Sequence, residues 1–241
     1  QNPFEAFDPR LSVRASLEQA LRIHDIGDKD RLDRISAAME AAGLSPAEDF
    51  LPRYPHELSG GQLQRIATVR ATLNEPELLI ADEPVSMLDV SVRAEILNQF
   101  LDLRDRYGLA IVLITHDIAV ARYVASRIAV MYLGQFVEIG SAADVIDAPL
   151  HPYTKALLSH TLTVGDEERT GEPIEISGDP PTPVDLKPGC RFASRCPFVF
   201  DRCRVETPQL LQVENRQQVA CHLYDAGAIR PTENQPLAAS R

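Results

Sequence analysis

Apolar residues recur at helical spacing along the first third of the chain, which predicts a succession of amphipathic helices. Two helices are expected between residues 10 and 43, the first capped by Ser12 and the second closed by Gly43. A third helix is expected to begin at Ser59, after a loop broken by prolines. The expected inward-facing residues are Val13, Leu17, Ala20 and Leu21, then Leu32, Ile35, Met39 and Ala42, then Leu63, Ile66 and Ala67.

Short continuous apolar runs replace this periodicity further along the chain. Residues 78–81 (LLIA) and 109–114 (LAIVLI) are typical of buried strands in a parallel sheet. A helix is expected between them over residues 92–107, and Gly108 ends it. The order strand, helix, strand implies a right-handed crossover. The elements expected next are a helix over residues 118–125 and a strand pair over residues 127–133 and 135–139.

Composition places the chain among soluble globular proteins. Its 241 residues are 44% hydrophobic and 24% charged, which is ordinary for that class. The net charge of -11 argues against a non-specific nucleic-acid binder, because such proteins carry a basic stripe. No secretory signal is visible and no apolar run is long enough for a membrane helix, so the expected location is cytoplasmic. After His160, prolines and glycines predict a linker into a small cysteine-bearing appendage.

The stretch Ser59-Gly60-Gly61-Gln62 has the composition of an anion site at a helix start. A serine there caps free backbone N–H groups, and two glycines let a ligand come close to them. The helix dipole adds partial positive charge, so a phosphate is a suitable ligand. The alternative is a plain capped helix that follows a loop.

Three further polar residues follow the two expected strands. Asp82 and Glu83 end the first strand, and His116 comes directly after the second. Ligands bind at the carboxyl edge of open parallel sheets, where one acid can hold Mg²⁺, the next can polarise a water, and a histidine can contact a phosphate. The alternatives are solvated acids at a strand end and a histidine that caps the next helix.

The order of these pieces along roughly residues 1–160 resembles the nucleotide-binding subunits of ABC transporters. LSGGQ resembles the ABC signature, LLIADEP the Walker B strand with its catalytic glutamate, and SMLD the D-loop, usually written SALD. His116 matches the switch histidine, and Gln1 resembles the Q-loop glutamine that senses Mg²⁺ and the permease. The resemblance implies an α/β fold of the P-loop NTPase type, with a parallel sheet core, a helical subdomain and a small C-terminal extension.

Within that family, the resemblance also implies a mechanism that uses ATP and Mg²⁺. Two cassettes face each other head to tail, so residues 59–62 would contact ATP held by the partner cassette. Asp82 would order Mg²⁺, Glu83 would activate water and His116 would brace the γ-phosphate. Asp89 would link the two sites across the interface.

Three segments resemble the oligopeptide and dipeptide importer ATPases, a subfamily that also serves nickel and related solutes. They are RYPHELSGGQ (Arg53 to Gln62), HPYTKALL (His151 to Leu158) and the cysteine tail from Gly189 onward. The implied partners are a second ATPase domain (identical, distinct or fused), membrane permease subunits and, indirectly, an extracytoplasmic solute-binding protein, with no nucleic acid. The implied location is the cytoplasmic face of the cell membrane.

The tail carries four cysteines with the spacing C-x5-C-x6-C-x17-C, namely Cys190, Cys196, Cys203 and Cys221. This spacing is not that of a zinc ribbon. Four thiolates can hold a 4Fe–4S cluster or a zinc ion. The resemblance favours the cluster, while unliganded thiols and oxidised pairs remain as alternatives.

The chain departs from the family pattern in one respect, since it contains no G-x-x-x-x-G-K-[ST] phosphate loop. Family members carry that loop upstream of the Q-loop glutamine, which is residue 1 here, so the sequence reads as truncated. We therefore expect an ABC-type ATPase that is inactive alone. Two alternatives are a soluble ABC ATPase without a permease, and a non-catalytic assembly or redox module.

Three parts of the chain are expected. Residues 1–75 would form the Q-loop and helical signature subdomain, and residues 76–160 the core with Walker B, D-loop and switch histidine. Residues 161–241 would form the extension with four cysteines.

Overall fold

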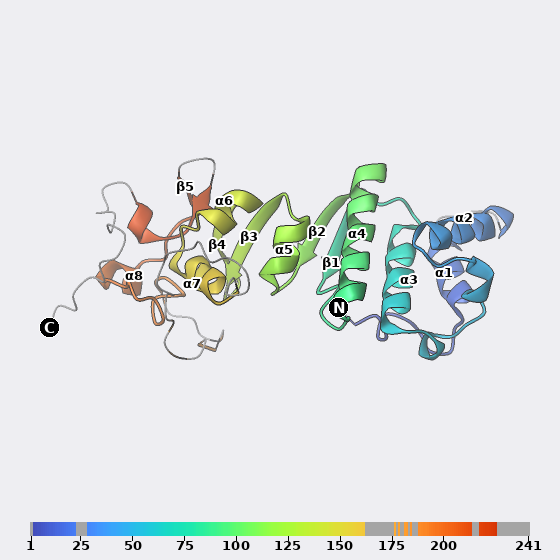
Figure 1. Cartoon of the computed structure of the whole chain (residues 1–241). Helices are drawn as coiled ribbons and strands as arrows, with labels where there is room; N and C mark the ends of the chain where they lie inside the picture. The colour runs from blue at the N-terminus through green and yellow to red at the C-terminus, as the bar shows by residue number, and fades with distance from the viewer. Residues whose placement is uncertain are drawn as a thin grey trace. The chain divides into compact units, whose positions relative to one another are not determined.

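The computed structural model describes most of the chain and divides it into two compact units, Gln1–Val120 and Ala121–Arg241 (Figure 1). The described residues are 2–22, 28–161, 176, 178, 181, 182, 184, 188–213 and 217–225.

Helices α1, α2 and α3 build the apolar core of the first unit (Figure 1). The buried positions on these helices, such as Leu17, Ile35 and Ile66, are those expected from the helical spacing. Burying one such side chain contributes about 1.5–3 kcal/mol. The helices and the short 3-10 turns between them are α1 (Val13–Arg22), α2 (Asp28–Ala41), η1 (Ala47–Asp49), η2 (Pro55–Glu57) and α3 (Gly60–Thr72).

The expected ends of the first two helices are confirmed. The Ser12 hydroxyl accepts a hydrogen bond from the backbone N–H of Ala15 at 3.3 Å. Gly43 lies just beyond α2 with φ of 75°, a left-handed conformation that glycine adopts at little cost.

The strand–helix–strand unit predicted from the apolar runs is present. Strands β1 (Leu78–Asp82) and β2 (Ala110–Ile114) pair in parallel, with Asp82 opposite Ile114. Helix α4 (Val90–Tyr107) connects them and ends at Gly108, where φ is 65°. Helix α5 (Ile118–Val124) follows β2. The register places the carboxyl ends of both strands at one edge of the sheet.

The expectation that both strands are buried was wrong for one face of the sheet. Leu78, Ile80, Val112 and Ile114 are each about half exposed or more. Helix α4 packs against β2, whereas among the described residues nothing covers the face that carries these side chains. A continuous apolar run indicates two faces suited to burial, but it does not supply what covers them.

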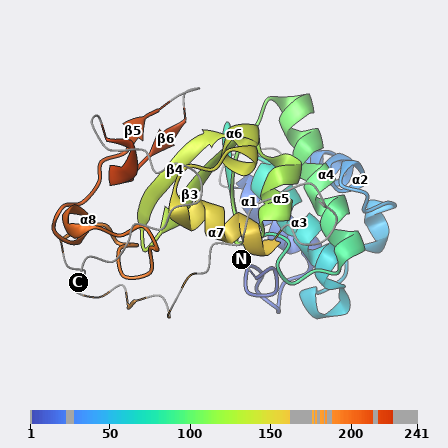
Figure 2. The ribbon, with the colours of Figure 1, turned by 60° about the vertical axis from the view of Figure 1, so that its left-hand side comes forward.

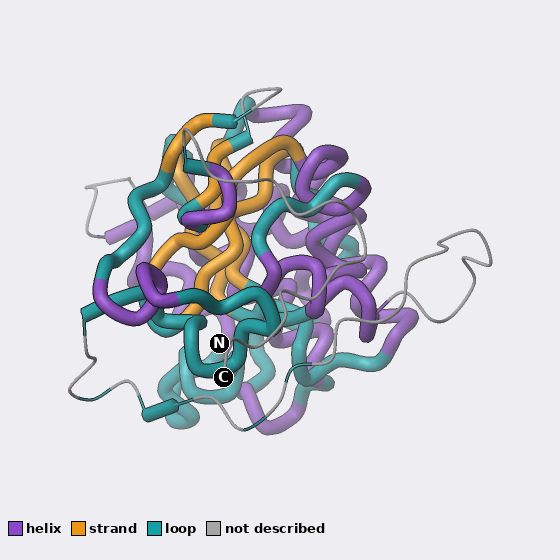
Figure 3. The backbone as a smooth tube through the Cα atoms, turned by 90° about the vertical axis from the view of Figure 1, so that its left-hand side faces the viewer, coloured by secondary structure: helices purple, strands orange, loops and turns teal. Residues whose placement is uncertain are grey.

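The second unit contains a hairpin extended by the C-terminal tail (Figure 2). Strands β3 (Arg127–Tyr132) and β4 (Gln135–Ser141) are antiparallel, as expected. In the tail, β6 (Gln218–Val219) pairs with β4 and β5 (Leu211–Gln212) pairs with β6, giving the order β3-β4-β6-β5, which the sequence did not predict. Figure 3 draws the strands in orange. The remaining elements are α6 (Ala142–Asp147), α7 (Pro152–Thr161), α8 (Asp201–Val205) and η4 (His222–Tyr224).

Most of the linker expected after His160 lies outside the described residues. None of the described helices combines the length and hydropathy needed to cross a membrane.

Candidate functional site

The start of α3 is held by a reciprocal cap. Ser59 is the N-cap residue, and its hydroxyl accepts from the backbone N–H of Gln62 at 3.3 Å. The Gln62 side-chain oxygen accepts in turn from the backbone N–H of Ser59 at 3.0 Å. This capping box satisfies two backbone donors that would otherwise lack partners. The alternative of a plain capped helix is therefore correct as far as the helix start is concerned, since residues 59 and 62 cap it.

Gly61 of this motif also has a packing role that the sequence did not reveal. A Cβ added at Gly61 would lie 2.5 Å from Cγ1 of Val92, which is closer than real contacts allow. A Cβ at Gly60 would lie 3.5 Å from Cδ2 of Leu88. The absence of a side chain at Gly61 lets the start of α3 approach the start of α4, whereas the contact at Gly60 would be an ordinary one. A ligand contact is thus not the only reason for glycine at residue 61.

The carboxyl edge of the sheet collects the expected acids and histidine. Asp82 is the exposed last residue of β1, and Glu83 follows it. The backbone N–H of Glu83 donates to the carbonyl of Ile114 at 2.9 Å, so the parallel pairing continues one step beyond the strand. His116 lies two residues after Ile114, the last residue of β2.

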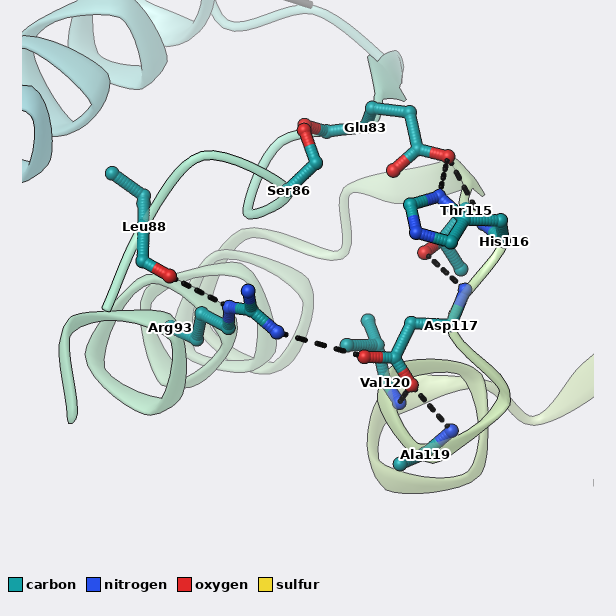
Figure 4. A network of polar contacts seen from close by, with 9 residues as sticks. All are labelled: Glu83, Ser86, Leu88, Arg93, Thr115, His116, Asp117, Ala119 and Val120. Atoms are coloured by element: carbon teal, nitrogen blue, oxygen red, sulfur yellow. Dashed lines mark hydrogen bonds and ion pairs between the residues drawn. The ribbon is translucent and has the colours of Figure 1, made fainter. Parts of the chain in front are cut away.

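Glu83 and His116 contact each other directly (Figure 4). The Glu83 Oε1 atom accepts from the backbone N–H of His116 at 3.0 Å and lies 2.7 Å from the ring Nδ1. Because a carboxylate only accepts, Nδ1 carries the hydrogen in this pair. The Glu83 side chain is 18% exposed and that of His116 is 79% exposed. The pair therefore offers an oriented carboxylate beside an accessible imidazole.

The backbone at Glu83 is held in an unusual conformation. Its φ is 46°, in the left-handed region that non-glycine residues rarely adopt. Such strain costs about 1–3 kcal/mol and is concentrated at functional sites. Here it occurs at the residue expected to activate water.

Asp89 and Gln1 complete the expected set. Asp89 occupies the N-cap position of α4, but its side chain makes no capping hydrogen bond and is exposed. Its carboxylate is therefore not used to stabilise the helix start. Gln1 lies outside the described residues.

All four cysteines of the tail are free thiols and line one small pocket in the second unit. Burial raises the pKa of Cys196 and of Cys221 to about 12, and it also raises the pKa of Cys190. In the described part of the chain, no three His, Cys, Asp or Glu side chains are placed to hold a single metal ion. The thiols are therefore gathered together without forming a closed zinc site.

A buried carboxylate near this pocket was not predicted. Glu138 of β4 is fully buried and accepts from the backbone N–H groups of Leu150 and His151 at 2.8 and 2.9 Å. Its Oε1 also accepts from the Gln217 side chain at 2.6 Å. The available signal was a glutamate at the centre of an apolar strand, QFVEI. The contacts join β4 to the start of α7 and to the tail.

His151 connects this carboxylate to the cysteine pocket, which it lines. Burial lowers the pKa of His151 to about 4, so the ring is neutral at physiological pH. Its Nδ1 accepts from the backbone N–H of Tyr153 at 3.0 Å. The ring centroid lies 5.7 Å from that of Phe192, which also lines the pocket.

Two family descriptions match this chain. Residues 1–86 match "ABC transporter", and residues 137–203 match "Oligopeptide/dipeptide transporter, C-terminal region".

Individual relatives match over nearly the whole chain. The di/tripeptide transport ATP-binding protein DppF of Pseudomonas aeruginosa is 43% identical over 92% of this chain and 68% of its own length. The putative oligopeptide transport ATP-binding protein YkfD of Bacillus subtilis is 42% identical over 93% of this chain and 68% of its own length.

A solved structure is also similar. The one described as "Dimeric Structure of MJ0796, a Bacterial ABC Transporter Cassette" has a TM-score of 0.52 and 30% identity. The similarity covers 59% of this chain and 61% of that chain, so just under two thirds of the solved cassette is represented here.

Proposed function

This chain belongs to the family of ATP-binding subunits of oligopeptide and dipeptide ABC importers, and we propose that it couples ATP binding and hydrolysis to peptide import. The ABC-type α/β fold and the use of ATP and Mg²⁺ come with the family. The observation that carries the proposal is the direct contact between Glu83 and His116 at the carboxyl edge of the sheet. The relatives named for di/tripeptide and oligopeptide transport support peptides as the solute class.

We propose that the residues at this edge divide the hydrolytic work. Asp82, exposed at the end of β1, would hold Mg²⁺, which supplies charge neutralisation on the phosphates. Glu83 would accept the proton of the attacking water. His116, with Nδ1–H held by Glu83, would donate from Nε2 to the γ-phosphate in its doubly protonated form, in which both ring nitrogens are donors. The positions of the three side chains at one edge support this assignment.

A second set of residues would act across a pair of cassettes. Ser59, Gly60, Gly61 and Gln62 would contact ATP held by a second cassette, whether identical, distinct or fused. Asp89, exposed and free of a capping role, would reach across the same interface. Gln1 would report Mg²⁺ occupancy to the permease. In this scheme residues 1–75 form the Q-loop and helical signature subdomain, residues 76–160 form the core that hydrolyses ATP, and residues 161–241 form the extension with four cysteines.

A groove on the first unit supports a permease as partner. It has a volume of about 330 Å³ and is lined mainly by small or apolar side chains. Arg70 forms one side, where its guanidinium donates to the carbonyl of Ala6 at 2.9 Å and lies 5.5 Å from the centroid of the Phe7 ring. The lining residues are Ala6, Phe7, Ala20, Ala67, Arg70, Ala71 and Asn74. Small residues allow close approach of a helix, so we propose that a cytoplasmic helix of the permease binds here.

Filling this groove should separate the chain from its permease. Replacing exposed Ala71 by Trp is expected to reduce copurification of the permease at least about tenfold, which corresponds to roughly 1.4 kcal/mol, because the indole would occupy the groove and keep a helix out of it. The matched control is Ala37→Trp, at an exposed position of α2 outside the groove. Undiminished copurification with the Ala71→Trp variant would contradict the groove assignment. A wild-type chain that captures no permease would favour a soluble ABC ATPase instead.

For the tail, we propose a 4Fe–4S cluster held by the four cysteines. Their convergence on one pocket supports a shared ligand. A single zinc ion with Zn–S bonds of about 2.3 Å needs sulfur atoms about 3.8 Å apart in a tetrahedron. The described residues contain no group of three or more such ligands placed to hold one metal ion. The high thiol pKa values mean that the cluster would displace protons when it binds.

Anaerobically purified protein is therefore expected to be brown, with an absorption band at about 400 nm. It should contain about four iron atoms per chain. The Cys196→Ser variant should lose the band, while Ser194→Ala, at an exposed position of the same loop, should keep it. A colourless protein with stoichiometric zinc, or with no metal, would contradict the proposal.

The proposed location is the cytoplasmic face of the cell membrane, with the chain held there by its permease. An extracytoplasmic solute-binding protein would act with it only indirectly.

A further inference from the structure

Arg93, in the first turn of α4, contacts both loops that carry the proposed site (Figure 4). Its Nε donates to the carbonyl of Leu88, in the loop before α4, at 2.7 Å. Its Nη1 lies 3.7 Å from Oδ2 of Asp117, the residue after His116. One guanidinium thus joins residues 86–89 to residues 115–117.

Asp117 is itself fixed by local hydrogen bonds. Its Oδ1 accepts hydrogen bonds from the backbone N–H of Ala119 at 2.9 Å and from that of Val120 at 3.4 Å. These bonds cap the start of α5. Its own N–H donates to the hydroxyl of Thr115 at 3.0 Å. One carboxylate oxygen therefore serves the helix start and the other faces Arg93. A displacement of Asp117 would move the backbone N–H of His116, which bonds Glu83.

The loop at residues 86–89, which Arg93 contacts through Leu88, is partly exposed. Met87 and Asp89 are exposed, and Leu88 contacts the start of α3 near Gly60. The hydroxyl of Ser86 donates to the Glu83 carbonyl at 3.0 Å. The planar guanidinium contacts both loops from one side chain, through a hydrogen bond to the Leu88 carbonyl and a longer ion pair with Asp117.

We propose that Arg93 is a positioning residue for ATP hydrolysis, which couples the loop at residues 86–89 to the Glu83–His116 pair through Asp117. The inference rests on the proposed roles of these loops and adds the link between them. When a second cassette contacts the exposed loop, Arg93 transmits the displacement to His116. In this proposal Arg93 does not bind ATP or the attacking water, and it acts by holding groups that do.

The coupling can be measured in this chain without turnover, by amide hydrogen exchange. The Arg93→Met variant is expected to raise exchange about fivefold or more in peptides covering both residues 85–90 and residues 114–119. Arg93→Lys should restore protection only in part, because an ammonium lacks the fork geometry. The matched control is Arg104→Met on the same helix, where Arg104 forms an ion pair with its exposed neighbour Asp105.

Asp117→Asn supplies a second and nearly isosteric variant. Asparagine retains the cap of α5 but removes the charge that faces Arg93. In the Asp117→Asn variant, the rate of amide hydrogen exchange in residues 114–119 should rise as it does in Arg93→Met. The double variant should exchange no faster in these residues than the Arg93→Met variant does. Additive effects of the two substitutions would overturn the proposal.

A spectroscopic signature tests the effect on the histidine itself. The ring Nδ1–H of His116, bonded to Glu83 at 2.7 Å, should give a downfield proton signal in nuclear magnetic resonance spectra. We expect this signal to shift upfield or broaden in Arg93→Met and to stay unchanged in Arg104→Met. An unmoved signal, or faster exchange in only one of the two loops, would overturn the coupling. Failure of the proposed function would appear separately, as ATP turnover that does not depend on Glu83.

Discussion

Replacing Glu83 by Gln should lower the rate of ATP turnover by about 10²–10⁴-fold while leaving ATP binding nearly unchanged. A glutamine oxygen can still accept from the backbone N–H of His116, as Glu83 does at 3.0 Å. The amide cannot take the proton of the attacking water, so the loss should fall on kcat and not on KM. Residues 1–241 contain no phosphate loop, so phosphate release is measured after a loop segment from this family has been joined to residue 1 and the chain has been assembled with its permease and a second cassette.

The matched control for this experiment is Glu77→Gln. Glu77 is an exposed acid immediately before β1, and it is remote from the carboxyl edge of the strand. Its replacement should leave turnover within about twofold of the wild-type rate, because surface substitutions away from special features have small effects. A Glu83→Gln chain that retains turnover would remove Glu83 from the proposed mechanism. The family assignment would stand, since it rests on sequence similarity.

Replacing Glu138 by Ala should destabilise the second unit by about 3–5 kcal/mol. The substitution leaves three donors without their acceptor, namely the backbone N–H groups of Leu150 and His151 and the amide of Gln217. Each buried donor without a partner costs about 1–3 kcal/mol, and part of this loss is relieved by relaxation or water entry. The change in unfolding free energy is measured by urea unfolding, with amide hydrogen exchange in β3 and β4 as the probe.

Two other substitutions sharpen that result. Glu138→Gln should cost less than Glu138→Ala, because one side-chain oxygen remains to accept. The matched control is Glu206→Gln, which changes an exposed acid paired with Arg202 at 2.7 Å. That pair lies in solvent, so its loss should have little effect. Equal unfolding curves for Glu138→Ala and Glu206→Gln would show that the buried carboxylate does not hold β4 to α7 and the tail.

Periodicity alone predicted most of the secondary structure. The helical spacing of Leu17 and Ile35 located α1 and α2, and the apolar runs located β1 and β2. Such patterns are local, since they depend on which side chains follow one another at a period of 3.6 or 2 residues. The two short strands of the tail escaped prediction because two-residue strands carry no periodicity. The pairing of β6 with β4 depends on residues far apart in the chain.

For the candidate site, the amino-acid order identified the chemical groups, and the fold determined how they are used. Glu83 and His116 could be named from LLIADEP and LITHD, because parallel strands bring their carboxyl ends to one edge. Their hydrogen bond, the contact of Gly61 with Val92 and the fork of Arg93 could not be named in this way.

These contacts join residues that are 5 to 33 positions apart and on different elements. They depend on backbone directions and side-chain rotamers, which a linear pattern does not contain. The residues of LSGGQ show both contributions. Their composition determined a helix start able to receive a phosphate, and only the packing of α3 against α4 decided that Gly61 is also required because a side chain there would collide with Val92.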